Sequence, residues 1–304
     1  MTKPRLQLGR AAGLRSRKTK LSIKPIWLFN RRCERLQRRF CFGGNVRKIV
    51  TTFFTVAATF LCLSKYEASA KDVVFVAGAT GRTGSGIVKG LAADGYDVIA
   101  MARDQSKAKG QTPGVRWVQG DVRDIDSLRR GMAGAAYVVS AIGATQITGP
   151  NASEFIDFSG TRNLADVAKE IGAKQFVLIA SGRTGPHIDH STRANGGYNR
   201  YFKTKGEEYL KASGVPYTIL GAAGLVEKPG GQMGVRFFSR IEYDATTKST
   251  DEMVVIVIPD IAAVVSSALK DPTARNKAFA IMNDAQRPVG AWRKEFATTD
   301  TNWP

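Results

Sequence analysis

The feature that most constrains the fold is the stretch from Asp72 to Leu91, where an apolar segment leads into a glycine-rich loop and then into a helical pattern. Residues 73–77 are all apolar over the length of one strand, as in a parallel sheet covered on both faces. Glycines follow at positions 78, 81 and 84, and apolar residues then recur at helical spacing. Strand, glycine turn and helix in this order predict a βα unit that binds a dinucleotide.

The glycines have separate roles in such a loop, because the turn must be tight, the backbone must approach a pyrophosphate, and the helix must pack close to the strand. The free N–H groups of the helix's first turn, with the positive end of its dipole, would face the phosphates. A tight turn without a ligand is the alternative interpretation. The residues expected to bind the cofactor here are Gly78, Thr80, Gly81, Arg82, Thr83 and Gly84.

Four later segments, together with the loop VFVAGATGRTG, carry a family resemblance. They are GDVRD, VVSAIGA, GTRNLADVAKEIGAKQFVLIASG and YFKTKGEEYLKASGVPYTIL. Over about residues 71–284 the chain resembles the atypical short-chain dehydrogenase/reductases, the NAD(P)-binding group related to the NmrA-like proteins. The resemblance implies an α/β fold with a Rossmann-like doubly wound parallel sheet and an NAD(P) cofactor, and it does not name a substrate.

The positive charge of the chain is concentrated at its N-terminal end. The whole sequence has 304 residues and a formal net charge of +19, and residues 1–70 hold 16 Lys and Arg against Glu34 and Glu67. Because the remaining chain is only mildly basic, the charge does not indicate nucleic-acid binding. The sequence predicts an organelle-targeting presequence over residues 1–70 and a single NAD(P)-binding domain over residues 71–304.

The expected presequence has two parts. Residues 1–45 are rich in Arg and nearly free of acid, like a transit peptide, and serine is sparse there. An uncharged run, Ile49–Leu63, then follows two basic residues and precedes Ala68-Ser69-Ala70, as in a signal peptide with its cleavage site. This arrangement predicts a plastid protein routed to the thylakoid, with a mitochondrial address and a single long presequence as alternatives.

The apolar run in the presequence is short for a membrane anchor. Residues 49–63 would span about 22 Å as a helix, against about 30 Å for the hydrocarbon core of a bilayer. A stable transmembrane helix is therefore not expected, while association with an organelle membrane stays open. Cleavage near Ala70 would also remove Cys33, Cys41 and Cys62, the three cysteines of the chain.

Arg103 suggests which nicotinamide cofactor binds. It follows the expected second strand, Asp97–Ala102, at the point where Rossmann sheets place an acidic residue for a ribose hydroxyl or a basic residue for a 2′-phosphate. Further basic residues lie at positions 82, 107 and 109, so the sequence favours NADP(H). Asp104 has the wrong sign, and a solvated charged loop is the alternative.

Two further strands, Val115–Gln119 and Ala136–Ser140, are expected to end at the cofactor. In the family the residue matching Asp121 lies beside the adenine ring, although helix capping is an alternative role for such an aspartate. Small residues after the next strand would let the backbone lie flat against the cofactor. The resemblance therefore adds five cofactor-binding residues: Asp121, Val122, Ala141, Ile142 and Gly143.

A crossover helix over Phe155–Ile171 and a strand over Gln175–Ala180 are expected next. Ser181 stands where the family places its active-site serine, and a turn-forming serine is the alternative. The polar loop Gly182–Gly197 is long enough to suggest a substrate lid. It carries both histidines, at positions 187 and 190, but too few candidate ligands for us to expect a metal site.

The next helix decides between two catalytic arrangements. Tyr201 and Lys205 match the Tyr-x-x-x-Lys spacing of standard short-chain reductases, in which the lysine lowers the pKa of a tyrosine acid. The family instead places a glutamate four residues after its lysine, and this pattern fits Lys203 and Glu207. We favour Lys203 as the cofactor-binding and catalytic lysine, which puts Asn199 at the tyrosine position, where it cannot act as an acid.

The C-terminal part departs from the family pattern. After the strand Tyr217–Leu220 the family's Arg-Pro-Gly-Gly is replaced by residues 221–224, Gly-Ala-Ala-Gly. Met253–Ile258 is expected to be the last buried strand, and Asp260 to cap the helix that follows. Residues 285–304 are expected to form a loosely attached tail.

These observations predict an NADPH-dependent oxidoreductase that transfers hydride to a small quinone-like or carbonyl acceptor. A quinone can take its proton from solvent, so a missing tyrosine acid need not abolish turnover. The alternative is a non-catalytic NADP(H)-binding assembly or scaffold protein at an organelle membrane. The expected partner is a small-molecule substrate, and neither the substrate nor the oligomeric state can be derived from the sequence.

Overall fold

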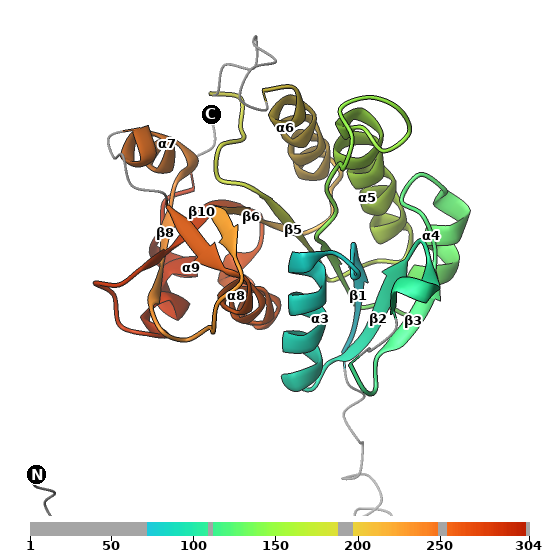
Figure 1. Cartoon of the computed structure of the whole chain (residues 1–304), viewed down its shortest axis with the longest axis horizontal. Helices are drawn as coiled ribbons and strands as arrows, with labels where there is room; N and C mark the ends of the chain where they lie inside the picture. Colours follow the sequence, from blue (N-terminus) through green and yellow to red (C-terminus); the bar gives the residue numbers. More distant parts are fainter. Residues whose placement is uncertain (1–71, 109–111, 188–196, 249–253, 302–304) are drawn as a thin grey trace, which may run out of the picture. The chain divides into compact units, whose positions relative to one another are not determined.

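The computed structural model describes residues 72–108, 112–187, 197–248 and 254–301, and its centre is a parallel sheet around β1 (Val73–Ala77). The sheet has eight strands in the order β3-β2-β1-β4-β5-β6-β10-β8 (Figure 1). Seven of them are parallel, and β8 pairs antiparallel with β10. The other strands are β2 (Asp97–Ala102), β3 (Arg116–Gln119), β4 (Tyr137–Ser140), β5 (Gln175–Ser181), β6 (Tyr217–Ala222), β8 (Gly234–Phe238) and β10 (Lys277–Asp284).

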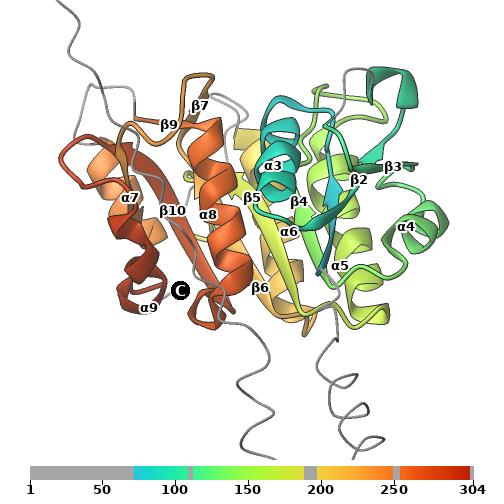
Figure 2. The same cartoon turned by 90° about the horizontal axis from the view of Figure 1, so that it is seen from below.

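Helices cover both faces of this sheet, as the doubly wound pattern requires. The helices α3 and α8 lie on one face, and α4, α5 and α6 lie on the other (Figure 2). The α-helices are α3 (Arg82–Ala93), α4 (Ile125–Met132), α5 (Thr161–Glu170), α6 (Gly197–Ala212), α7 (Arg240–Lys248), α8 (Ile258–Lys270) and α9 (Glu295–Thr298).

Alternation along β1 feeds two separate cores. Val74 and Val76 pack with residues of α3 and α8, whereas Phe75 and Ala77 pack with residues of α4, α5 and α6. All four are fully buried, which explains why this strand is a continuous apolar run. The predicted α/β fold with a Rossmann-like doubly wound sheet is therefore confirmed.

The strand order reverses at β1, because β2 and β4 lie on its two sides. Val74 of β1 is in register with Val98 of β2 and with Tyr137 of β4. In open α/β sheets the crevice outside the carboxyl ends of such strands is where ligands bind. The glycine loop follows β1 directly and therefore lies at this crevice.

The C-terminal part differs from the sequence expectations. The expected last strand forms β9 (Val255–Val257), which pairs with β7 (Gly224–Val226) in a separate two-stranded sheet, and the last strand of the main sheet is β10. Asp260 is not a cap, because α8 begins at Ile258. Its carboxylate accepts hydrogen bonds from Gly231 N and Asn283 Nδ2, both at 2.7 Å, and so holds a loop.

Two other expectations are corrected by burial and by helix geometry. The expected loose tail carries Trp292 and Phe296, which are 5% and 0% exposed and pack against Phe237 of β8. These aromatic anchors attach the tail firmly. The expected crossover helix begins with a π-helical segment, Glu154–Gly160, before α5 starts.

Among the described residues, none of the helices combines the length and hydropathy that crossing a bilayer requires.

Helix α3 packs unusually close to α8 because glycine faces α8 on successive turns. A Cβ atom at Gly90 would lie 2.7 Å from Cβ of Ala262, and one at Gly86 would overlap the side chain of Ile258. The two glycines are four residues apart and therefore lie on one helix face. Helix α3 is thus positioned by the glycine loop at its start and by its close contact with α8 along its length.

This packing predicts that Gly90→Ala destabilises the protein by about 1 to 3 kcal/mol through overpacking. On an exposed helix the same change would stabilise the protein by up to about 1 kcal/mol. The sign of the change in the free energy of unfolding therefore shows whether Gly90 is packed against α8. Urea unfolding measures the effect. Ala262→Gly removes the opposing methyl group, and the double variant should be more stable than the sum of the single effects by at least about 0.5 kcal/mol. Additive effects or a stabilised Gly90→Ala variant would contradict this packing.

Candidate functional site

The glycine loop after β1 allows a very close approach of three pieces of backbone. Gly78 has φ of +77°, and a Cβ atom there would lie 2.6 Å from the carbonyl oxygen of Ala141 after β4. A Cβ atom at Gly84 in α3 would overlap the carbonyl group of Gly78. The loop closes through a hydrogen bond from Gly81 N to Gly78 O at 3.0 Å. Both the turn and the helix packing therefore require glycine.

The start of α3 suits an anion. Gly81 is its N-cap residue and offers no side-chain capping bond, and the helix has no acidic residue in its first turn. The N–H groups of such a first turn, with the helix dipole, attract phosphate. Arg82 is exposed at this point, whereas Thr83 and Gly84 are buried. The loop thus offers backbone donors, with little side chain in the way.

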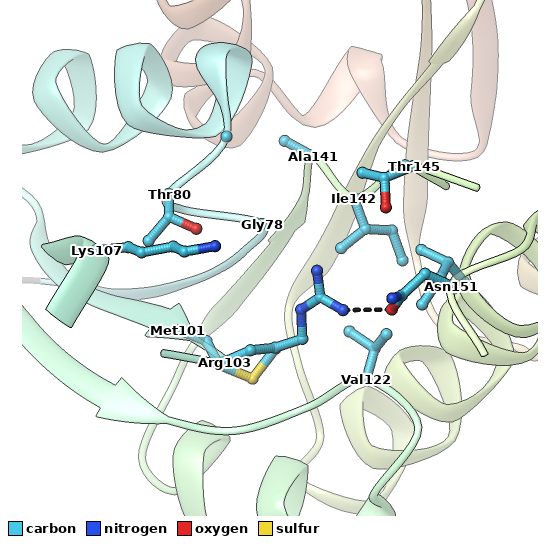
Figure 3. A pocket seen from close by; sticks show the side chains of 13 residues that line it. Gly78, Thr80, Met101, Arg103, Lys107, Val122, Ala141, Ile142, Thr145 and Asn151 are labelled. Carbon is cyan, nitrogen blue, oxygen red and sulfur yellow. Dashed lines mark hydrogen bonds between the residues drawn. The ribbon is translucent and has the colours of Figure 1, made fainter. Parts of the chain in front are cut away.

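A cavity of about 320 Å³ lies at the crevice beside this loop (Figure 3). Residues that follow four neighbouring strands line it, so it is built by the sheet rather than by one loop. Four of the lining residues were not expected near the cofactor from the sequence: Met101, Thr145, Asn151 and Ile156. A fifth, Lys107, was among the basic residues that favoured NADP(H). Eight lining residues were expected to bind the cofactor: Gly78, Thr80, Gly81, Arg103, Val122, Ala141, Ile142 and Gly143.

Arg103 extends from the end of β2 into the cavity. Its Nη1 donates to Oδ1 of Asn151 at 2.5 Å, and Lys107 lines the same cavity (Figure 3). The neighbouring Asp104 turns to its own loop, where Oδ1 accepts from Ser106 N at 2.9 Å. Hydrogen bonding to Ser106 keeps the pKa of Asp104 below its ordinary value. Arg103 and Lys107 therefore line the cavity, and Asp104 and Arg82 do not. Lys109 lies outside the described residues.

Asp121 lies beside the cavity but is not part of its lining. Its carboxylate accepts two hydrogen bonds from the side chain of Arg123, from Nε at 2.9 Å and from Nη2 at 2.6 Å. The hydrogen bond from Arg123 holds the pKa of Asp121 below its ordinary value. Arg123 Nη1 also donates to the carbonyl oxygen of Pro150 at 3.0 Å. The position expected beside adenine is thus tied to the loop that carries Asn151.

Lys203 of α6 is not part of the cavity lining, but its side chain reaches towards Gly143, which is. Its Nζ donates to Oδ1 of Asp157 at 2.5 Å, and a Cβ atom at Gly143 would lie 3.9 Å from that Nζ. The Asp157 side chain is 2% exposed and also accepts from the hydroxyl of Ser153. Asp157 was not singled out in the sequence, where the signal was a charged residue inside an apolar helical pattern. A buried ion pair is stable only when hydrogen bonds also satisfy the remaining carboxylate oxygen, as the Ser153 hydroxyl does here.

Tyr201 and Lys205 lie elsewhere on α6. Tyr201 is 40% exposed, and Lys205 Nζ lies 5.7 Å from its ring centre. Lys205 is paired with Glu208 at 2.8 Å, and both of these side chains are more than one-third exposed. Residues two apart on a helix point in nearly opposite directions. The structure therefore brings Lys203, and not Lys205, towards Gly143.

A buried ion pair joins α7 in the C-terminal part to α6. Arg240 and Glu207 have side chains 1% and 0% exposed, with Nη2 at 3.5 Å from a carboxylate oxygen. Arg240 Nη1 also donates to the carbonyl oxygen of Ser181. Burial raises the pKa of Glu207, and the charge of Arg240 opposes this. A side chain at Gly221 would overlap the Arg240 guanidinium. Arg240, although distant in the sequence, therefore fills the space beside residues 221–224, the turn in which the family's Arg-Pro is replaced.

Ser181, the other expected catalytic residue, is not part of the cavity lining. Its hydroxyl accepts from Arg183 N at 3.2 Å, and it is half-buried at the end of β5. The following Thr184 donates to Glu207 at 2.5 Å and so attaches the start of the expected lid to α6. Residues 188–196, with most of the expected lid and with His190, lie outside the described residues. Within the described chain no cluster of His, Cys, Asp and Glu could hold a metal ion.

A family model described as NAD(P)H-binding matches residues 78–272 of the chain. The match begins at the first glycine of the loop and extends through helix α8, so it includes six strands of the main sheet and leaves out β1 and β10. The glycine loop, the cavity beside it and this family match all indicate an NAD(P)H-binding site. The chain therefore belongs to this NAD(P)H-binding family, and the resemblance to the NAD(P)-binding group of atypical short-chain dehydrogenase/reductases is confirmed.

Individual relatives extend this result. An uncharacterised chloroplastic protein of Arabidopsis thaliana is 31% identical over 82% of this chain and 77% of its own length. Sanguinarine reductase of Eschscholzia californica is 30% identical over 76% of this chain and 95% of its own length. The photosystem II assembly factor Ycf39 of Cyanophora paradoxa is 27% identical over 69% of this chain and 63% of its own length.

A solved structure supports the fold. A Bacillus halodurans protein assigned as an NAD-dependent epimerase/dehydratase superposes with a TM-score of 0.61 over 75% of this chain and 97% of its own. Its sequence identity to this chain is 21%. At that identity the likeness carries the fold and not the activity.

Proposed function

We propose that the protein binds NADP(H) in this cavity and uses it to reduce a small quinone-like or carbonyl acceptor. The observation that carries the proposal is that Arg103 and Lys107 line the same cavity as the glycine loop. A guanidinium can make two charge-assisted hydrogen bonds to a 2′-phosphate and gains nothing comparable from a hydroxyl. The glycine loop and the start of α3, with Thr80 and Arg82 to Gly84, would hold the pyrophosphate.

The remaining residues would orient the nicotinamide end. When bound, NADPH supplies a hydride. The Lys203 ammonium, held by Asp157 at 2.5 Å, would donate to the nicotinamide ribose. Ala141 to Gly143 would lie beneath that ribose, and the Ser181 hydroxyl would donate to the acceptor oxygen. A quinone-like acceptor would then take its proton from solvent, because Asn199 holds the tyrosine position in the Lys203 register.

The cofactor choice gives the first test of this proposal. We expect NADPH to bind at least tenfold more tightly than NADH, about 1.4 kcal/mol, because only NADPH carries the 2′-phosphate. Arg103→Ala should remove most of that preference while leaving NADH binding nearly unchanged. Calorimetry measures both dissociation constants, and Arg130→Ala on the far end of α4 is the matched control. Equal constants in the unsubstituted protein would contradict the assignment of NADP(H).

The lysine register gives the second test. Lys203→Ala should weaken NADPH binding by about 1 to 3 kcal/mol through loss of a charged donor. Lys205→Ala, in the exposed pair with Glu208, should stay within about 0.5 kcal/mol and is the matched control. Because Lys203→Ala alone leaves the buried Asp157 carboxylate without its cation, the double variant with Asp157→Asn separates binding from folding. The reverse pattern would restore Tyr201 and Lys205 as the catalytic pair.

A second candidate is an NADP(H)-binding assembly protein without chemistry. It is favoured by the exposure of Tyr201, 40%, away from the cavity, and by the likeness to an assembly factor. Incubation with NADPH and a panel of quinones, followed by the absorbance of the reduced nicotinamide, separates the two. A reductase should oxidise NADPH with at least one acceptor, and Tyr201→Phe should leave that rate nearly unchanged. NADPH binding without oxidation would favour the assembly role.

We also infer a plastid location, with the thylakoid as destination. The basic N-terminal segment and the chloroplastic relative support this inference. Cleavage after Ala70 should give a mature chain that begins near Lys71 and lacks all three cysteines. N-terminal sequencing of protein from isolated plastids checks this start. A start upstream of Ile49 would instead support a retained apolar segment at the membrane.

A further inference from the structure

The loop after β4 reaches across the mouth of the cavity to Arg103. Asn151, in this loop, lines the cavity, and its Oδ1 accepts from Arg103 Nη1 at 2.5 Å (Figure 3). The two residues are far apart in the sequence, and the contact joins the end of β2 to the segment that precedes α5. The Arg103 side chain is otherwise exposed at this edge. One neutral amide oxygen therefore orients the main cation of the cavity.

The position of Asn151 is set by backbone contacts on both sides. Its carbonyl oxygen accepts from Thr145 N at 3.3 Å, and Gln146 and Ala152 form a parallel bridge. The carbonyl oxygen of the preceding Pro150 accepts from Arg123 Nη1 at 3.0 Å. Arg123 is itself held by the carboxylate of Asp121 after β3. The amide of Asn151 is thus presented by a braced loop, and side-chain substitution leaves these backbone contacts in place.

An amide oxygen suits the orientation of an anion-binding arginine. A guanidinium has five N–H donors, so one bond to Asn151 leaves the others for a phosphate. The neutral acceptor restricts the side chain without cancelling its charge, whereas a carboxylate at this position would neutralise the guanidinium and repel a phosphate. Holding the arginine before the ligand arrives lowers the entropy lost on binding.

We propose that Asn151 is a positioning residue that sets the preference for a 2′-phosphorylated cofactor by holding the Arg103 guanidinium. This proposal rests on the proposed NADP(H) site. It assigns the preference of that site for NADP(H) over NAD(H) to two residues: Arg103, which follows β2, and Asn151, in the loop after β4. The contribution of Asn151 acts through Arg103, so it should disappear when Arg103 is absent.

Calorimetry with NADPH and with NADH tests the proposal on the full chain. Asn151→Ala should weaken NADPH binding at least threefold and leave NADH binding within twofold. Asn151→Asp should weaken NADPH binding further, because it adds a carboxylate beside the phosphate site. Gln146→Ala, an amide truncation in the same loop outside the cavity lining, is the matched control and should change neither constant. In the Arg103→Ala background, Asn151→Ala should have no further effect on the NADPH to NADH ratio.

The outcomes separate this proposal from the one on which it rests. If Arg103→Ala lowers the ratio but Asn151→Ala does not, the NADP(H) site stands and the role of Asn151 is refuted. If Asn151→Ala weakens both cofactors equally, its role is structural and the proposal is likewise refuted. If the unsubstituted protein shows no preference, the assignment of NADP(H) itself fails, and the proposal fails with it.

Discussion

The rest of the site depends on the close approach of β1, the glycine loop and α3. Side chains at Gly78 and Gly84 would meet the backbone of Ala141 and of Gly78 itself. This approach places the start of α3 over the crevice between β1 and β4, where the strand order reverses. The same helix is held at its other face by Gly90 against α8. Backbone donors for a phosphate are therefore fixed by packing rather than by side chains.

The segment between β4 and α5 contacts two of the expected cofactor-binding cations. Its Asn151 contacts Arg103 in the cavity, and its Asp157 contacts Lys203, which lies outside the cavity lining. Asp157 belongs to a π-helical segment, a feature that often marks functional sites in helices. One stretch of chain therefore holds both cations.

The sequence predicted those parts of the protein that are governed by local pattern. The strand, glycine turn and helix at 73–93 are contiguous, so spacing indicated the loop and its lining residues Gly78, Thr80 and Gly81. The family resemblance, and not spacing, supplied Val122 and Ala141 to Gly143. Asn151 and Arg240 could not be predicted in this way, since each acts on a residue more than 45 positions away. The same limit explains why strand β10 and the burial of Phe296 were not predicted, because their partners lie on the distant strands β6 and β8.

The most direct measurement of the central claim is a crystal structure of the protein with NADP⁺ bound. We expect the 2′-phosphate within hydrogen-bond distance of the Arg103 guanidinium, the pyrophosphate at the start of α3, and the nicotinamide ribose at Lys203 Nζ. A cofactor bound elsewhere would contradict the assignment of this cavity. A cofactor bound there with its nicotinamide ribose on Lys205, or with its 2′-phosphate away from Arg103, would contradict the roles given to these residues.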